Sequence, residues 1–84
     1  MNSITFALKA IRQLRKLPRQ DSVKIYDECE KLAAMPHCAN VKALSNHAYQ
    51  YRLRVGNYRV FFNFDGAVQI VNIEEVKKRD ENTY

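Results

Sequence analysis

Long apolar runs are missing from this sequence, and their absence excludes a chain that crosses a membrane by helices. Hydrophobic residues make up 46% of the 84 residues, but no stretch approaches the roughly 20 apolar residues of a membrane-spanning helix. Charged residues from Lys9 onward also interrupt the apolar start, so we expect no secretory signal and a cytoplasmic location. A single domain over residues 1–84 is expected, because this length supports only one small core.

Cysteine is scarce, which excludes a disulfide-rich scaffold and a zinc-finger pattern. The two cysteines are Cys29 and Cys38, and a cytosolic setting favours free thiols. Cys29 falls on the apolar face of an expected helix, where we interpret it as a small core residue. His37 and His47 lie in expected loop, and no further ligands complete a metal site with the cysteines. We therefore expect no metal and no cofactor.

Familiar catalytic motifs are also absent. The sequence has no P-loop, no glycine-rich nucleotide loop, no paired-carboxylate site and no supported Ser/His/Asp arrangement. If this protein cleaves a substrate, the catalytic groups must be arginine, lysine and tyrosine. Such groups suit RNA, whose 2′-hydroxyl attacks the adjacent phosphorus while cations stabilise the phosphate and a proton reaches the 5′-oxygen. A general base that works near neutral pH is the missing part.

Acidic residues are absent from two blocks of the chain, residues 1–20 and 41–60. The basic residues of these blocks are Lys9, Arg12, Arg15, Lys16 and Arg19, then Lys42, Arg52, Arg54 and Arg59. With a net charge of +5, this clustering indicates a polyanionic partner such as nucleic acid. An acidic protein partner and a merely solvated basic surface remain alternatives.

Helical periodicity marks the N-terminal half. Apolar residues at helical spacing predict a helix over 7–17, which Pro18 ends. A second helix is expected over 18–35, where Met35-Pro36 stops it. Its apolar stripe consists of Ile25, Cys29, Leu32 and Ala33. Two antiparallel helices with a short joint follow.

Strand periodicity marks the rest of the chain. We expect a short first strand over 2–6, a loop over 37–47, and strands over 49–55, 58–64 and 67–74. Gly56-Asn57 and Asp65-Gly66 are turn signals between them, and a charged tail is expected from Glu74. The predicted fold is α+β, with two N-terminal helices packed on a twisted antiparallel sheet.

A basic, aromatic-rich surface follows from this arrangement. Arg52 and Arg54 share one strand face, the hairpin turn returns Arg59 toward it, and the tail cations approach from the end of the last strand. Cations interleaved with aromatic rings are typical of surfaces that bind single-stranded nucleic acid, although exposed arginines also serve solubility. The available aromatics are Tyr49, Tyr51, Tyr58 and Tyr84. Most of these tyrosines are expected in the core, which leaves Tyr84 as the best candidate for a functional phenol.

Three segments, in this order, resemble motifs of the RelE/ParE toxins. Residues 51–62, YRLRVGNYRVFF, resemble the hallmark hairpin of these toxins. Residues 40–44, NVKAL, resemble the segment that leads into the hairpin, and residues 77–84, KKRDENTY, resemble a basic tail that closes on tyrosine. The resemblance covers essentially the whole chain, and the expected order of elements agrees with it.

The resemblance implies a microbial-RNase-like α+β fold and a bacterial toxin–antitoxin operon. A cognate antitoxin protein is then expected to cover the basic surface, and the complex would bind operator DNA through the antitoxin. RelE-type members cut mRNA in the ribosomal A site, which implies a metal-independent endoribonuclease with mRNA and the ribosome as partners.

The resemblance also assigns candidate residues. Arg59 matches the arginine after the hairpin turn, Arg52 matches one strand cation, and Tyr84 matches the tail tyrosine. The tail cation is Arg79, or Lys78 if the alignment shifts by one residue. The other strand cation falls on Gln50, a departure that would weaken phosphate neutralisation. The residues expected to contact RNA outside the catalytic set are Gln50, Lys42, Lys77, Lys78 and Arg54, the last of which lies on the same strand face and could replace the lost charge.

Two alternatives stay open. The ParE branch shares the fold but poisons DNA gyrase, and it generally lacks the catalytic tail, so the tail tyrosine and cation favour RNA cleavage. The third alternative is a non-catalytic RNA-binding member of the same fold.

Overall fold

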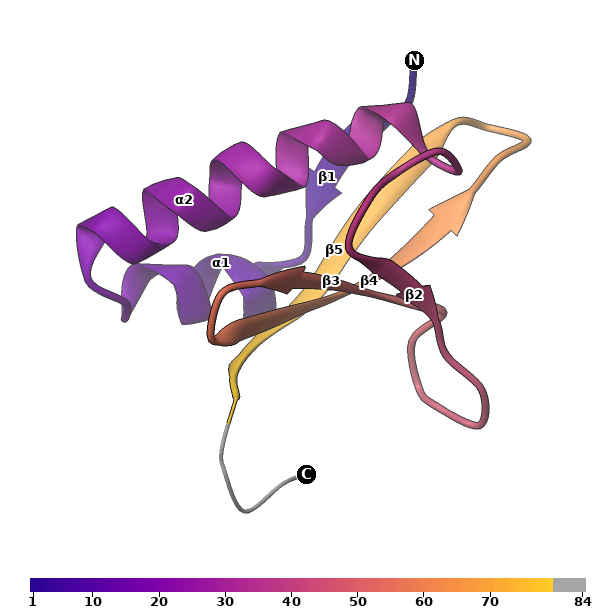
Figure 1. Ribbon diagram of the computed structural model, residues 1–84. Helices are drawn as coiled ribbons and strands as arrows, with labels where there is room; N and C mark the ends of the chain where they lie inside the picture. The colour runs from indigo at the N-terminus through magenta and orange to yellow at the C-terminus, as the bar shows by residue number, and fades with distance from the viewer. Residues whose placement is uncertain (80–84) are drawn as a thin grey trace.

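The structure is a computed structural model that describes residues 1–79. Two helices lie along one side of a five-stranded sheet (Figure 1). The elements in chain order are β1 Ser3–Phe6, α1 Leu8–Arg15, α2 Arg19–Glu30, the 3-10 helix η1 Lys31–Ala34, β2 Val41–Ala43, β3 Tyr51–Val55, β4 Tyr58–Asp65 and β5 Ile70–Lys78. The expected α+β class is confirmed, with both helices N-terminal to the main strands.

The helices form where the periodicity predicts them, within shorter bounds. In α1, Ala10 and Leu14 are buried, and in α2 the buried residues are Ile25 and Cys29. Pro18 stands immediately before α2 with φ −53°, which suits a helix start because proline fixes φ there and has no N–H to satisfy. The segment after Glu30 was expected to continue the α-helix, but it tightens into η1, as the last turn of a helix often does.

The strands occur in the order β1-β5-β4-β3-β2. The meander β3-β4-β5 is antiparallel, as predicted, and β1 adds to the outer side of β5 in parallel orientation. Both helices and the other three strands lie between β1 and β5 in the chain. Gly56 adopts φ +53° in the β3–β4 turn, a left-handed conformation that glycine adopts without a steric penalty.

The predicted loop over 37–47 is partly wrong, because it contains β2. This strand pairs with β3, with Lys42 opposite Arg52. A three-residue strand with exposed Lys42 and Ala43 carries no alternation that sequence reasoning could detect. Asn40, at φ 63°, precedes β2, a left-handed conformation that asparagine tolerates better than most residues.

The predicted bounds of the last strand are also wrong. Residues 67–69 belong to the turn after β4, and β5 continues through the segment that was expected to be a charged tail. The strand continues because Val76 enters the core while its neighbours Glu75 and Lys77 lie on the opposite face. The backbone N–H of Val76 donates to Gln13 Oε1 at 2.6 Å. Beyond the end of β1, the Gln13 side chain of α1 therefore accepts the hydrogen bond from the outer edge of β5.

The core lies between the helices and one face of the sheet. It includes Ala10, Leu14, Ile25, Cys29, Leu32, Leu53, Val55, Val60, Phe62, Val71, Ile73 and Val76. Burial of Cys29 confirms its interpretation as a core residue. The other sheet face, which we call the open face, carries the side chains that alternate with these core residues, and it holds most of the candidate residues.

Candidate functional site: a cationic sheet face

Three cations form one row across β3, β4 and β5. Arg54 is opposite Arg59, and Arg59 is opposite Lys77. Residues directly opposite each other on neighbouring strands share a face, and like charges in these positions repel. The members of this cationic row (Arg54, Arg59 and Lys77) therefore repel one another, although Lys77 is also paired with Glu75 at 3.7 Å, and an anion bound along the row would reduce the repulsion.

Arg59, the middle member of the row, is 7% exposed. Its Nη1 donates to the carbonyl oxygens of Gly56 and Tyr58, each at 2.9 Å. The guanidinium thus holds the β3–β4 turn as well as lying among other cations. Asp65, at the far end of β4, does not bind Arg59, since its Oδ1 accepts from the backbone N–H groups of Ala67 and Val68.

Arg52 lies on β3, two residues before Arg54 of the cationic row and on the same face. It is half-buried, opposite Lys42 on β2 and Phe61 on β4. Its Nε is buried and has no hydrogen-bond partner among residues 1–79. A buried guanidinium donor without an acceptor is costly, and an anionic ligand at this point would supply the acceptor.

Gln50 stands where the resemblance implies a cation, and it forms hydrogen bonds with residues of β4. Its Oε1 accepts from the backbone N–H of Phe64 at 2.9 Å, and its own N–H donates to Asn63 Oδ1 at 2.9 Å. The side chain therefore extends the β4 edge pairing just before β3 begins. The contacts of Gln50 with Asn63 and Phe64 are therefore structural, and they do not supply the missing positive charge.

The tail cations separate onto different faces. Lys77 belongs to the cationic row, whereas Lys78 is opposite Tyr58 on the helix-facing side. Arg79 follows, and its backbone N–H donates to Asn57 O at 2.6 Å, next to the hairpin turn. Arg79 and Lys78 are the two candidates for the tail cation. Arg79 lies just after the end of β5, and Lys78 lies on the side of the sheet that faces the helices. Tyr84 lies outside the described residues.

An aromatic cluster, which sequence analysis did not identify, covers part of the open face. His47 stacks on Phe61, with ring centroids 5.0 Å apart and an interplanar angle of 15°. Tyr49 contacts both rings, at 5.8 Å from His47 and 5.9 Å from Phe61. Tyr49 had been considered for stacking on bases, but His47 lies in a bend with no periodic signal. Most of the tyrosines were expected in the core. Tyr51 and Tyr58 do pack against it on the helix side, whereas Tyr49 lies with Phe61 on the open face.

Glu75 is an acid that the register places directly beside this cluster, opposite Phe61. It is 8% exposed and pairs with Lys9 at 3.3 Å and with Lys77 at 3.7 Å. Burial alone raises the pKa of Glu75, but hydrogen bonds from Lys9 and Tyr49 and the charges of Lys9 and Lys77 lower it below its ordinary value. Burial and the neighbouring Glu75 raise the pKa of Tyr49. Tyr49 and Glu75 thus influence each other at this side of the cluster.

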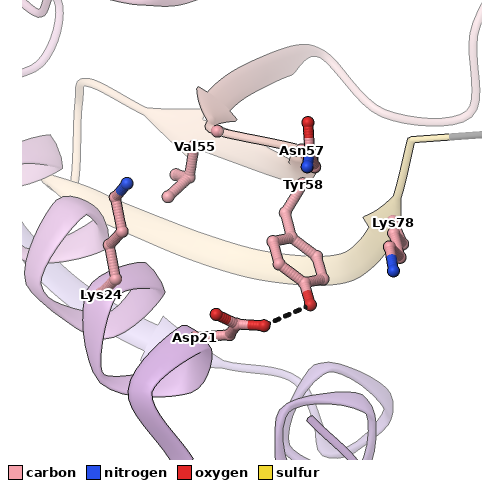
Figure 2. A pocket seen from close by; sticks show the side chains of 7 residues that line it. Asp21, Lys24, Val55, Asn57, Tyr58 and Lys78 are labelled. Carbon is pink, nitrogen blue, oxygen red and sulfur yellow. Dashed lines mark hydrogen bonds between the residues drawn. The ribbon is translucent and has the colours of Figure 1, made fainter. Parts of the chain in front are cut away.

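A separate pocket lies on the helix side of the hairpin, with a volume of about 270 Å³. Figure 2 shows Tyr58 pointing across it toward Asp21, with Lys24 and Lys78 at its sides. The Tyr58 hydroxyl donates to Asp21 Oδ2 at 2.8 Å, a bond that raises the pKa of Tyr58. This contact ties the start of α2 to β4 and belongs to the framework of the hairpin.

Neither a metal site nor a membrane helix is found in the part of the chain that the structure describes. Residues 1–79 contain no group of three or more His, Cys, Asp or Glu side chains that could hold a metal ion. None of the described helices is long and apolar enough to cross a membrane.

Residues 4–83 match the model of a family described as the ParE toxin of the type II toxin–antitoxin system parDE. The chain belongs to this family. The toxin is accordingly a member of the RelE/ParE superfamily, which confirms the resemblance seen in its hairpin and tail. A search of curated proteins found no match.

Solved RelE structures share the fold of this toxin at low sequence identity. The RelBE2 toxin–antitoxin complex of Mycobacterium tuberculosis matches with a TM-score of 0.80 and 24% identity, covering 93% of this chain and 98% of that one. The archaeal RelE–RelB complex of Pyrococcus horikoshii OT3 matches with a TM-score of 0.80 and 20% identity, covering 95% and 97%. Isolated E. coli RelE matches with a TM-score of 0.79 and 16% identity, covering 96% and 87%.

Proposed function

We propose that this toxin is a ribosome-dependent endoribonuclease that cuts mRNA and so stops translation. The observation that carries the proposal is the cationic row, in which Arg54, Arg59 and Lys77 face one another across three strands. A folded protein tolerates such repulsion where a ligand compensates for it, and a phosphodiester backbone supplies the required negative charge. The buried, unpartnered Nε of Arg52 adds a donor on the same face.

The proposed chemistry needs no metal. The RNA 2′-hydroxyl attacks the adjacent phosphorus and the bond to the 5′-oxygen breaks. A 2′,3′-cyclic phosphate remains at the end of the upstream fragment, and the downstream fragment leaves with a 5′-hydroxyl. Arg59 and Arg52 hold the phosphate through the attack, as arginine donors suit its oxygens. Arg79 stabilises or protonates the leaving 5′-oxygen. Tyr84 either takes the 2′-hydroxyl proton or stacks on a base; as a base it needs nearby cations, because a free phenol has a pKa of about 10.

A cognate antitoxin is the second part of the proposal. The solved complexes from Mycobacterium tuberculosis and Pyrococcus horikoshii pair RelE-like toxins with antitoxins. An acidic or amphipathic antitoxin segment would neutralise the open face and use apolar anchors for affinity. In this proposal the bound antitoxin also carries the complex to operator DNA.

Inhibition of DNA gyrase is a second candidate function, and two observations favour it. The matching family model is that of ParE rather than RelE. In addition, Gln50 replaces a cation and binds the backbone of β4, while Arg59 Nη1 already serves two carbonyls. Both features reduce the charge available for phosphate chemistry.

The test supplies the toxin with purified ribosomes and a defined mRNA and maps cuts by primer extension. We expect cuts on ribosome-bound mRNA only, and suppression of cutting by the antitoxin. The same preparation is added to a gyrase supercoiling assay, where we expect no effect. Intact mRNA together with blocked supercoiling would replace the ribonuclease proposal by the gyrase one. Bound but uncut RNA would indicate a non-catalytic RNA-binding member.

Two variants connect that assay to the cationic row. Arg54→Gln and Lys77→Gln should each slow cleavage about 10- to 100-fold, because a hydrogen bond to a charged group contributes roughly 1.5–3 kcal/mol. Arg12→Gln is the matched control, since Arg12 is an exposed cation of α1. Equal loss of rate in all three variants would mean that net charge, not the row, drives cleavage.

A further inference from the structure

The stacked rings of the open face form a built feature rather than a random surface contact. Phe61 is 9% exposed although its neighbours on the same face are charged, and it does not belong to the main core. The ring that covers it is His47, which is itself exposed to solvent. A phenylalanine on a polar sheet face is therefore shielded by an imidazole whose outer side is open.

Two hydrogen bonds hold the loop that carries His47, one that joins its two ends and one inside it. Leu44 N–H donates to Gln50 O at 2.9 Å, which closes the loop beside β3 and β4. Within it, Tyr49 N–H donates to His47 Nδ1 at 3.1 Å. This bond holds the imidazole in one orientation on Phe61. The arrangement presents the outer face of a flat ring to solvent.

Tyr49 holds the side of the cluster against the sheet. Tyr49 and Glu75 are close enough to shift each other's pKa, and Glu75 is held by Lys9 of α1 and by Lys77. One buried carboxylate therefore connects α1 to β5 beside the loop. The rings themselves are packed on the sheet through their contacts with Phe61.

Cations surround the rings on the open face. Phe61 is opposite Arg52, which is opposite Lys42, and the cationic row lies two residues along the strands, about 7 Å away. An aromatic surface flanked by guanidinium and ammonium groups suits a base together with its phosphates. An acidic peptide would use the cations and gain little from the rings.

We propose that His47 and Tyr49, supported by Phe61, form a platform on which a nucleobase of single-stranded RNA stacks while its backbone lies on the cations. The inference rests on the proposed function, because it requires RNA as the substrate. It adds a base-binding subsite formed by the loop before β3, separate from the tail tyrosine.

The test measures binding of a fluorescent hexaribonucleotide to the full-length toxin by anisotropy at low salt. His47→Ala and Tyr49→Ala should each weaken binding about 5- to 100-fold, the range for loss of one base–aromatic stack. His47→Phe and Tyr49→Phe keep the rings and should bind within about threefold of wild type. His37→Ala, at an exposed histidine in another loop, is the matched control and should leave binding unchanged.

A second oligonucleotide separates stacking from charge. An abasic hexamer has the same phosphates without bases, so the wild type should bind it more weakly than the base-bearing RNA, and His47→Ala should bind both equally. If wild type and His47→Ala prefer the bases equally, the platform is wrong although RNA binding stands. If the wild type binds neither oligomer, the RNA-based function is wrong, and the platform with it.

Discussion

Single residues of one type behave differently here because their surroundings differ. Arg59 is buried and its Nη1 holds the hairpin turn, whereas Arg54 beside it is exposed. A substitution at Arg59 removes turn-stabilising bonds together with the charge, at a cost of about 0.5–1.5 kcal/mol for each bond. Loss of activity in Arg59→Ala would therefore mix instability with lost phosphate binding. Arg54, which is exposed, reports on the phosphate more directly, whereas Lys77 is also paired with Glu75.

The two cysteines give a prediction at the same scale. Burial, with a smaller contribution from Glu28, raises the pKa of Cys29 to about 12. Cys38 is half-buried, and its thiol donates to Lys31 O at 3.3 Å. Because the thiolate is the reactive form, a thiol reagent at pH 8 should label Cys38 in the folded toxin and reach Cys29 only after unfolding. Mass spectrometry with and without denaturant checks the order.

A variant sharpens this measurement. Cys38→Ser should leave the folded toxin unlabelled, and one label should appear in denaturant. Rapid labelling of Cys29 in folded Cys38→Ser would show that the core between α2 and the sheet opens readily, contrary to the burial of Cys29.

The candidate site was predictable where it follows strand alternation. Arg52, Arg54 and Arg59 share a face because two-residue periodicity and a two-residue turn fix their direction. His47 could not be found in this way, since bends have no period and its contact with Phe61 spans different segments. Lys77 and Lys78 lie on opposite faces because β5 continues through both of them. The charged composition of this segment had predicted a tail instead of a strand.

At the level of elements, β5 connects the sheet to α1. Its inner edge pairs with β4, and its outer edge pairs first with β1 and then receives Gln13 of α1. Lys9 reaches Glu75 from the same helix. The strand was underestimated from sequence because lysine and glutamate suggest a solvated tail, although Val76 between them is buried. β2 was missed because its three residues become a strand only through pairing with β3.

The link between α1 and β5 predicts an acid-dependent stability. The pKa of Glu75 is lowered from an ordinary 4.5. The contribution of the ionised Glu75 carboxylate to the free energy of unfolding is therefore complete above pH 4.5. This contribution is lost as the pH falls through the lower pKa of the folded state. Glu75→Gln should reduce the free energy of unfolding by about 1–2 kcal/mol at pH 7. The difference should shrink toward zero near pH 3, as measured by urea unfolding.

Glu30→Gln is the matched control, because Glu30 is exposed at the end of α2. It should change stability by less than about 0.5 kcal/mol at either pH. A loss in Glu75→Gln that persists undiminished at pH 3 would show that side-chain packing, rather than the ionised carboxylate, holds β5 to α1.

For the whole molecule, the distribution of charge matters more than the total of +5. Positive side chains gather on the open face through β2, β3, β4 and β5, while the acids of α2 lie on the helix side. The helix side also carries cations, since α1 and the residues around it hold Lys9, Arg12, Arg15, Lys16 and Arg19. The cations of the open face differ in that they lie opposite one another on neighbouring strands, so a polyanion along the sheet contacts several of them at once. A cationic residue on the helix side should contribute little to binding even though it adds equally to the net charge.

Salt dependence tests this asymmetry. Four accessible cations of the open face, Lys42, Arg52, Arg54 and Lys77, would neutralise about four phosphates of a single strand. The slope of log K against log salt concentration should then be roughly −3, since each neutralised phosphate contributes about −0.7. Arg54→Gln should make the slope shallower by about 0.7, because it removes one of these contacts, whereas Arg12→Gln on α1 should leave it unchanged. Titrations of labelled RNA at several salt concentrations provide the slopes. Equal slopes for the two variants would mean that RNA responds to the total charge and does not lie on the open face.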